Sequence, residues 1–415
     1  MKFDDYNFSE EVTESIRRLG FKRPTDIQYK CIPPVLKGED LLAIAQTGTG
    51  KTAAFAIPII EKLHTKKQAQ SRKDGIKVLV MVPTRELALQ INEVFEELVA
   101  GTRVKTFCVH GGVEQDPQIK KLEKGLDVLI ATPGRMFDLV SQGFIKLNRI
   151  TTLVLDEADH MLDLGFIKDI RDLMRHLPKN RQTLFFSATI DQEIKKLAYS
   201  LVVNPIRIQI SPKDPVAKNV NHAIAFVEMD DKRFFLEKII KNHIDSKFLV
   251  FTRTKVRAER VLKAMERVDI QSLSIHGDKD QKERFSVMEK FKKGEVKVLI
   301  ATDVSARGID VPHVDYVVNY DLPEQAENYV HRVGRTGRGK NKGLAYSFCS
   351  TDEKPLLKDI EDLIGKKISV VDMDRMEYDS VKASSEQSHA DWKTLMKEMD
   401  EDDKKYKKKK KKRKK

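Results

Sequence analysis

The sequence predicts an α/β protein with two tandem domains, each a mostly parallel sheet flanked by helices, followed by a disordered basic tail. Three observations support this class. A chain of 415 residues is too long for one ordinary domain and suits two of about 200 residues each. Short β-branched runs alternate with helical patterns, and part of the first half recurs in the second.

The runs that predict strands are apolar almost throughout. In the first half they cover 41–45, 78–82, 106–110, 128–131, 152–155 and 183–187. Between them lie amphipathic stretches such as 86–99, whose apolar residues mark mostly one helical face. Continuous apolar strands separated by helices indicate a parallel sheet covered on both sides.

Three segments of the first half return in the same order in the second. They are KVLVMV at 77–82 with KFLVF at 247–251, His110-Gly111 with His276-Gly277, and VLIAT at 128–132 with VLIAT at 298–302. The offsets are 170, 166 and 170 residues. Such constancy indicates duplication of a whole domain.

Changes in composition predict the boundaries. Residues 211–218 contain two prolines and no apolar periodicity, as an exposed linker does. We therefore expect a first domain over 1–210, a second over 219–371, and a charged, mostly disordered extension over 372–415.

Composition also excludes several classes of protein. Hydrophobic residues form 40% of the chain, which is enough for packed cores. There is no apolar stretch near the ~18 residues of a membrane span, and the acidic N-terminus does not resemble a signal peptide. Cys31, Cys108 and Cys349 are predicted to be reduced packing residues. A cytoplasmic setting is therefore expected.

The net charge of +13 is concentrated at one end. Residues 404–415 hold eleven basic side chains, so the rest of the chain carries 13 − 11 = +2. This run is expected to be disordered. It is either a tether that neutralises nucleic-acid phosphates without reading sequence or a solvated tail that aids solubility.

A phosphate-binding loop is predicted between the strand at 41–45 and the apolar helical stretch at 53–63. Its members are Ala45, Gln46, Thr47, Gly48, Thr49, Gly50, Lys51 and Thr52. Backbone N–H groups can cradle phosphate, Lys51 can reach the outer phosphates, and the Thr52 hydroxyl suits Mg²⁺. Ala45 stands where the strict pattern has glycine.

An acidic cluster follows the strand at 152–155. Asp156 suits the Mg²⁺ shell, largely through water, and Glu157 is placed to orient and deprotonate an attacking water. A helix start enriched in acids would explain one carboxylate but not three in four residues, since Asp159 follows.

The second half has no phosphate loop but offers arginines. The segment 329–338 contains His331, Arg332, Arg335 and Arg338 with glycines between them. Arg335 and Arg338 are expected to share one helical face and to stabilise charge on a transferring phosphoryl group. The alternative is a patch that binds nucleic-acid phosphates.

Together these motifs resemble the DEAD-box RNA helicases, whose name stands as letters at 156–159. The resemblance runs from Phe3 to Val370 and is greatest for the bacterial RhlE-like branch, given the short N-terminus, the segment 163–166 and the basic tail. It implies two RecA-like domains. It also implies that Gln28 pairs with adenine, Phe21 stacks on it, and Asp310 contacts ribose. Arg335 and Arg338 match the arginine fingers of that family.

The same resemblance implies further roles. Coupling of hydrolysis to unwinding is implied for Asp159, Ser187, Thr189 and His331. Contacts to the RNA backbone, or links between motifs, are implied for Pro83, Thr84, Arg85, Gly111, Gly112, Thr132, Pro133, Gly134, Arg135, Arg253, Gln281, Arg284, Thr302 and Asp303.

An RNA-dependent ATPase that locally unwinds RNA is thus expected, with ATP and Mg²⁺ as cofactors and RNA bound through its backbone. The branch suggests ribosome assembly, RNA decay or degradosome-like assemblies. A monomer is assumed, with no membrane partner. The rival interpretations are a DNA-directed helicase of the same superfamily and an RNA annealing chaperone or scaffold.

Overall fold

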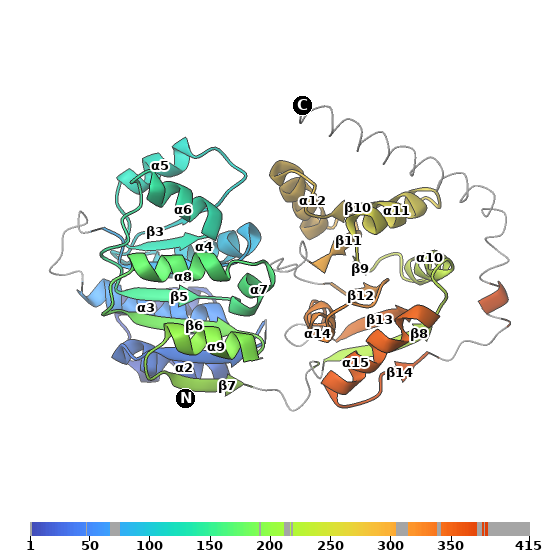
Figure 1. The fold of residues 1–415 in the computed structure, drawn as a ribbon, viewed down its shortest axis with the longest axis horizontal. Helices are drawn as coiled ribbons and strands as arrows, with labels where there is room; N and C mark the ends of the chain where they lie inside the picture. Colours follow the sequence, from blue (N-terminus) through green and yellow to red (C-terminus); the bar gives the residue numbers. More distant parts are fainter. Residues whose placement is uncertain are drawn as a thin grey trace.

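The computed structural model contains two α/β domains that lie side by side (Figure 1). It describes residues 2–46, 48–66, 75–190, 192–210, 216, 219–303, 314–337, 342–371, 376 and 378–380. No helix within these ranges is both long enough and apolar enough to cross a membrane.

In the described part of the first domain, seven parallel strands form one sheet in the order β3-β4-β2-β5-β6-β1-β7. The strands are β1 (Leu41–Ala45), β2 (Val78–Met81), β3 (Thr106–Val109), β4 (Val128–Ala131), β5 (Thr152–Leu155), β6 (Gln182–Ser187) and β7 (Ile206–Ile210). The helices are η1 (Phe3–Tyr6), α1 (Glu10–Arg18), α2 (Asp26–Lys37), α3 (Lys51–Lys66), α4 (Arg85–Val99), α5 (Asp116–Glu123), α6 (Pro133–Ser141), α7 (Ala158–Asp163), α8 (Ile167–His176) and α9 (Gln192–Leu201).

The second domain has the same sheet order, β10-β11-β9-β12-β13-β8-β14, in seven parallel strands of its described residues. The strands are β8 (Val220–Phe226), β9 (Phe248–Thr252), β10 (Ser272–Ile275), β11 (Val298–Thr302), β12 (Tyr316–Asn319), β13 (Gly343–Cys349) and β14 (Ser369–Val370). The helices are α10 (Lys232–Asn242), α11 (Lys255–Glu266), α12 (Gln281–Lys293), α14 (Ala326–Val333), η3 (Thr351–Glu353) and α15 (Lys354–Ile364).

The repeated sequence segments occupy equivalent strands. The pair 77–82 and 247–251 lies on β2 and β9, and the two VLIAT segments lie on β4 and β11. The two His-Gly pairs follow β3 and β10. Two domains of one topology, as predicted from the repeat, are therefore present.

Each sheet is buried on both faces, because helices cover both sides. In β1, Leu41 and Ala43 face a core formed with α1 to α4, whereas Leu42 and Ile44 face a second core formed with α6, α8 and α9. The six predicted strands of the first domain agree with the structure to within one residue at each end. β7 was not predicted, since Ile206 and Arg207 are exposed at the sheet edge and interrupt the apolar run.

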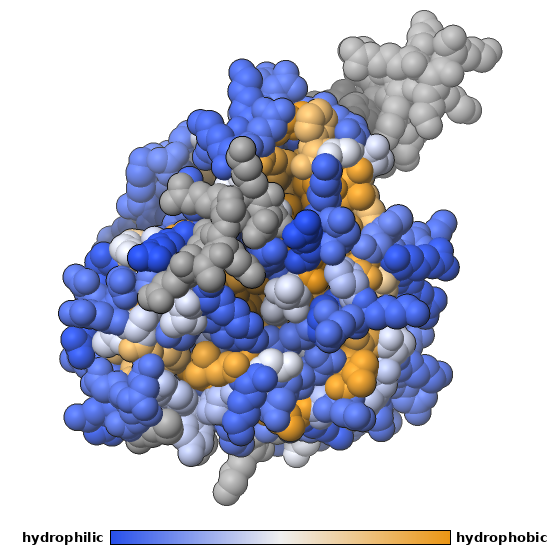
Figure 2. All heavy atoms as spheres, turned by 90° about the vertical axis from the view of Figure 1, so that its left-hand side faces the viewer, coloured by the Kyte–Doolittle hydropathy of each residue, from blue (hydrophilic) through white to orange (hydrophobic). Residues whose placement is uncertain are grey.

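The face of the first domain that is turned away from the second is mainly hydrophilic, with small separate apolar areas (Figure 2). Apolar side chains are concentrated in the interior instead. The three cysteines are free and buried, as predicted.

Most of the predicted linker, 211–218, and most of the predicted tail, 372–415, lie outside the described residues, so those boundaries stay predictions. Within the tail, Tyr378 packs against Phe235 at 5.0 Å between ring centroids. Its hydroxyl donates to Asp231 Oδ2 at 2.8 Å. This described part of the extension is thus attached to the second domain.

Asp40 joins three strands of the first sheet. Its carboxylate accepts hydrogen bonds from the backbone N–H groups of Thr183 and Val203, both at 2.7 Å. Its carbonyl accepts from the N–H of Ile206 at 2.8 Å. These bonds connect the start of β1 to β6 and to the chain that enters β7.

We expect Asp40→Ala to lower the free energy of unfolding by about 2–4 kcal/mol, because the buried N–H group of Thr183 and the partly buried N–H group of Val203 lose their acceptors. Chemical denaturation followed by circular dichroism measures this. The control is Asp172→Ala, whose ion pair with Arg175 at 3.0 Å is solvent-exposed and contributes less than about 1 kcal/mol. Equal losses in the two variants would contradict the assignment.

Candidate functional site

The loop between β1 and α3 has the backbone geometry of a phosphate cradle. Gly48 and Gly50 have φ angles of 79° and 92°, in the left-handed region that favours glycine. A Cβ atom at Gly50 would lie 2.6 Å from Gln28 Nε2, so a larger residue there would push the two segments apart. Of the predicted loop residues, Thr47 lies outside the described part. Ala45 ends β1, and Lys51 and Thr52 begin α3.

Lys51 is buried, and its ammonium group has no hydrogen-bond partner among the described residues. A buried cation without a partner is unfavourable, so this one favours an anionic ligand. The N-terminus of α3 adds backbone N–H donors and a positive dipole end at the same place. The loop therefore fits the outer phosphates of a nucleotide.

The segment 20–28 is held against this loop. Gln28 Nε2 donates to Gly50 O at 3.2 Å, and Thr25 Oγ1 donates to Thr49 O at 2.8 Å. Gln28 Oε1 accepts from Thr25 N at 2.9 Å, which caps the start of α2. Phe21 stacks on the buried Phe3, with ring centroids 6.3 Å apart. The segment predicted to read adenine thus also supports the phosphate loop.

The two adjacent carboxylates have different environments. Asp156 follows β5, and burial raises its pKa to about 6, although the charge of Lys51 acts in the opposite direction. Burial also acts to raise the pKa of Glu157, but His160, Lys51 and Arg335 outweigh it and lower that pKa to about 2. A Glu157 held as a carboxylate can orient a water and is a weak proton acceptor.

Glu157 is also held in an unusual backbone conformation. Its φ of 51° is left-handed, which is strained for a residue with a side chain. Its carboxylate contacts His160 Nδ1 at 3.4 Å. His160 was not predicted from the sequence. The only signal was its position three residues after Glu157 at the start of a short helix, which places both side chains on one side of α7.

Asp159 connects α7 to the loop after β6. Its Oδ2 atom accepts from the backbone N–H groups of Ala188 and Thr189, both at 3.0 Å, and from Thr189 Oγ1 at 3.2 Å. Ser187 ends β6, and its buried hydroxyl lacks a partner in the described part of the chain. Hydrogen bonds of Asp159 thus join the acidic segment to the loop that follows Ser187.

A cavity of about 240 Å³ lies between the two domains beside these two segments. Its walls include Glu157, His160 and Thr189 from the first domain and His331 and Arg335 from the second. Figure 1 shows α7 and α14 on the facing sides of the two domains. The arginine segment predicted to act on the nucleotide therefore reaches the predicted catalytic carboxylate.

One expectation about this segment is wrong. Arg335 and Arg338 were expected on one helical face, but α14 ends at Val333 and Arg335 lies in the turn beyond it. Gly334 is the C-cap, and a glycine favours the end of a helix. Arg338 and Asp310 lie outside the described residues.

A second group of predicted residues gathers at the carboxyl ends of β2, β3 and β4. Thr84 caps α4, accepting from Leu87 N at 3.3 Å, and Pro133 begins α6. Arg135 Nη2 donates to Val113 O at 2.8 Å. Burial lowers the pKa of Arg85, and the charges of Arg284 and Arg135 lower it further, with Glu86 acting against them.

The remaining predicted members of this group come from both domains and lie near strand ends. They are Pro83 after β2, Gly111 and Gly112 after β3, Thr132 and Gly134 at the start of α6, Arg253 after β9, Gln281 at the start of α12, and Thr302 and Asp303 at the end of β11.

An ion pair joins the two domains in this region. Arg284 Nη2 on α12 lies 2.7 Å from Glu86 Oε1 on α4, and both side chains are mostly buried. Arg284 was predicted to face RNA or to link motifs, whereas its partner Glu86 was not predicted. The structure therefore brings Arg284 to Arg85 and Arg135 across the interface.

Comparison with known proteins decides the family. Residues 25–197 match the DEAD/DEAH box helicase domain, and residues 231–340 match the helicase conserved C-terminal domain. DEAD-box ATP-dependent RNA helicase 20 of Arabidopsis thaliana is 40% identical over 88% of this chain and 74% of its own length. The chain belongs to the DEAD-box family of ATP-dependent RNA helicases.

Two further matches agree with this assignment. DEAD-box ATP-dependent RNA helicase CshA of Geobacillus kaustophilus is 39% identical over 88% of this chain and 77% of its own length. Dbp5 of S. cerevisiae bound to RNA and ADP BeF3 superposes with a TM-score of 0.80 at 30% identity, over 92% of this chain and 99% of that one. One superposition covers both domains, so this DEAD-box helicase has them in a similar relative placement.

The nucleotide site also fits a divalent cation. Asp156 is buried with a raised pKa, and a nearby cation would offset the cost of its charge. Thr52, one residue after Lys51, adds a hydroxyl at the same helix start. Oxygen donors of this kind suit Mg²⁺, which keeps most of its waters.

The pair Glu86–Arg284 distinguishes two roles for Arg284. We expect Arg284→Glu to reduce RNA-stimulated ATPase roughly tenfold, since it places two carboxylates together across the interface. The exchange Glu86→Arg with Arg284→Glu should recover most of that loss if the pair stabilises closure. Steady-state ATPase against RNA concentration measures both.

The control for that exchange is Glu289→Lys with Lys293→Glu, an exposed pair on the same helix α12 at 2.7 Å. Its activity should equal that of the wild type. An exchange at 86 and 284 that recovers nothing would mean that Arg284 acts by contacting RNA and not by closing the domains.

Proposed function

We propose that this DEAD-box helicase hydrolyses ATP between its domains and uses the resulting closure and opening to separate short RNA duplexes. One observation carries the proposal: Glu157 of the first domain and Arg335 of the second line the same cavity. The superposition on Dbp5 bound to RNA and ADP BeF3 supports the interpretation of this arrangement as the closed one.

The phosphates of ATP would lie on the loop 46–50, with the Lys51 ammonium on the outer phosphates. When bound, Mg²⁺ held through Asp156 and Thr52 would neutralise phosphate charge. Glu157, fixed by its backbone and by His160, would orient the attacking water. Arg335 would stabilise the charge that develops on the transferred phosphoryl group.

The RNA backbone would lie across the carboxyl ends of β2, β3 and β4 and reach the second domain. Arg85, Arg135 and Arg284 supply positive charge there, and helix starts at Thr84 and Thr132 supply N–H donors. We expect these donors to contact phosphate and sugar and not base edges. Binding should therefore be independent of sequence.

Finer assignments remain part of this proposal. The segment 163–166 and the basic run at 404–415 support a RhlE-like member that acts in ribosome assembly or RNA decay. The run at 404–415 would add non-specific RNA affinity. Three buried free thiols support a reducing, cytoplasmic setting.

Replacing Glu157 with glutamine tests the hydrolysis step. We expect Glu157→Gln to reduce kcat by roughly 10²–10⁴-fold, because the amide cannot orient or accept a proton from water as a carboxylate does. Binding of ATP and RNA should persist, measured by fluorescence anisotropy. Glu193→Gln, at an exposed site on α9, is the control. A variant that retained turnover would remove Glu157 from this role.

Replacing Arg335 tests the contribution of the second domain. We expect Arg335→Ala to lower kcat by roughly 10³-fold with little change in the KM for ATP, since its charge matters most in the transition state. Steady-state ATPase at saturating RNA separates the two constants. An equal change in kcat and in nucleotide affinity would instead indicate a binding role in the ground state.

A further inference from the structure

The second domain contains a counterpart of the nucleotide site. By sheet order, β8 and α10 occupy the places of β1 and α3. Lys232 is the first residue of α10, as Lys51 is of α3. Asp321 lies just after β12, as Asp156 lies just after β5. The connection 227–231 reads VEMDD and lacks the glycines that a phosphate loop needs.

In this counterpart a carboxylate of the chain itself faces the lysine. Lys232 Nζ donates to Glu353 Oε2 at 2.5 Å and lies 3.7 Å from Asp321 Oδ1. The three side chains are at most 2% exposed. The same Glu353 oxygen accepts from Ser350 N at 3.1 Å and from Ser350 Oγ at 3.2 Å. Glu353 thus pairs with the ammonium group whose counterpart in the first domain, Lys51, has no hydrogen-bond partner among the described residues.

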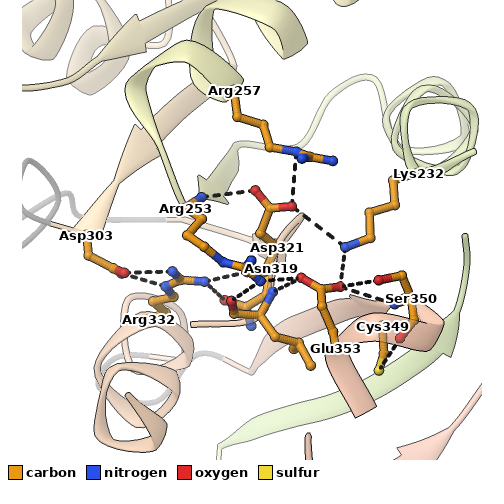
Figure 3. A network of polar contacts seen from close by, with 11 residues as sticks. Lys232, Arg253, Arg257, Asp303, Asn319, Asp321, Arg332, Cys349, Ser350 and Glu353 are labelled. Carbon is orange, nitrogen blue, oxygen red and sulfur yellow. Dashed lines mark hydrogen bonds and ion pairs between the residues drawn. The ribbon is translucent and has the colours of Figure 1, made fainter. Parts of the chain in front are cut away.

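The other oxygen of Glu353 holds Arg253. Arg253 Nη2 donates to Glu353 Oε1 at 2.8 Å and to Leu322 O at 3.3 Å. The backbone N–H of Arg253 donates to Asp321 Oδ2 at 3.0 Å. Figure 3 shows Lys232 and Arg253 reaching Glu353 from two sides. One guanidinium nitrogen is therefore fixed by buried acceptors.

Part of the Arg253 side chain stays accessible to a ligand. Its Nε atom is fully buried, but 31% of the side chain is exposed. Arg253 follows β9, whose counterpart β2 leads to Thr84 and Arg85. A partly exposed arginine whose guanidinium is fixed on its inner side suits a phosphate oxygen.

Lys232 makes this arrangement stable. Burial lowers the pKa of Lys232, and the charges of Glu353 and Asp321 act against that shift. Without the ammonium, Arg253 would be the one cation paired with the buried Glu353 carboxylate, and we expect the carboxylate to draw that side chain inward. With it, Glu353 is neutralised from both sides and the arginine keeps one fixed orientation.

We propose that Lys232 and Glu353 are positioning residues for RNA binding: their ion pair, built in the counterpart of the nucleotide site, orients the Arg253 guanidinium toward the RNA backbone. The inference rests on the proposed RNA contact of Arg253. The part of the second domain that corresponds to the nucleotide site thereby positions an RNA-binding side chain.

The test uses the full chain and a single-stranded RNA oligonucleotide, with the RNA concentration for half-maximal ATPase as the readout. The variant Lys232→Met with Glu353→Gln removes one charge of each sign, and such paired replacements often leave stability unchanged. Lys241→Met with Glu237→Gln makes the same changes in an exposed pair of α10 and is the matched control.

We expect Arg253→Ala and the Lys232→Met/Glu353→Gln variant each to raise the half-saturating RNA concentration roughly tenfold, as loss of a charge-assisted bond does. The KM for ATP should not change. Combining Arg253→Ala with the pair should give no further rise, because both act through one contact. Thermal denaturation confirms that each variant is folded.

Multiplied effects in the combined variant would overturn the proposal, since Glu353 and Arg253 would then act independently. The proposal would also be overturned if Arg253→Ala raised the half-saturating RNA concentration while the paired variant behaved like the wild type. Where the paired variant does not fold, Ser350→Ala, which frees one side of Glu353, must raise the half-saturating RNA concentration for the proposal to stand. No effect of Arg253→Ala would instead refute its RNA contact, and with it the inference, while the hydrolysis mechanism would be unaffected.

Discussion

A buried ammonium group without a partner in the described chain is the constraint on which this site depends. Lys51 is held at the start of α3, close to the buried Asp156. That one carboxylate does not hydrogen-bond its ammonium group, so a further anion would stabilise it. The equivalent Lys232 is neutralised internally by Glu353. The two domains thus have lysines at equivalent positions of one topology. The first lysine is left for a triphosphate, and the second is already paired with a carboxylate of the chain. This difference supports the proposal that the first domain binds nucleotide and the second acts on it.

Taken by itself, the first domain holds a strained but incomplete form of the proposed catalytic group. Glu157 is kept in a left-handed conformation and ionised, yet the guanidinium beside it belongs to the second domain. Catalysis can therefore depend on domain placement, because the charge that stabilises the transferring phosphoryl group arrives only when the domains meet. Arg335 lies in a turn and not on a helix, so the position of its side chain depends on where α14 ends.

The sequence predicted what depends on local pattern. Strand β5 was located because three apolar residues follow the β-branched Thr152, and the loop at 45–52 because its glycines and Lys51 follow an apolar strand. Contacts between distant segments had no such signal. Glu86 meets Arg284 across 198 residues of chain, and Lys232 meets Glu353 across 121. Charged residues at those positions are also typical of solvated helix faces, and only the tertiary structure shows them buried.

The interface between the domains also explains why RNA and nucleotide should assist each other. Closure places Arg284 beside Arg85 and Arg135, and their mutual repulsion is part of what lowers the pKa of Arg85. Three guanidinium groups share this region with the Glu86 carboxylate. Glu86 offsets part of this repulsion, and an RNA backbone across these arginines, as proposed, would offset more of it. In the proposed mechanism ATP favours the same closed arrangement through Arg335, so each ligand would strengthen binding of the other.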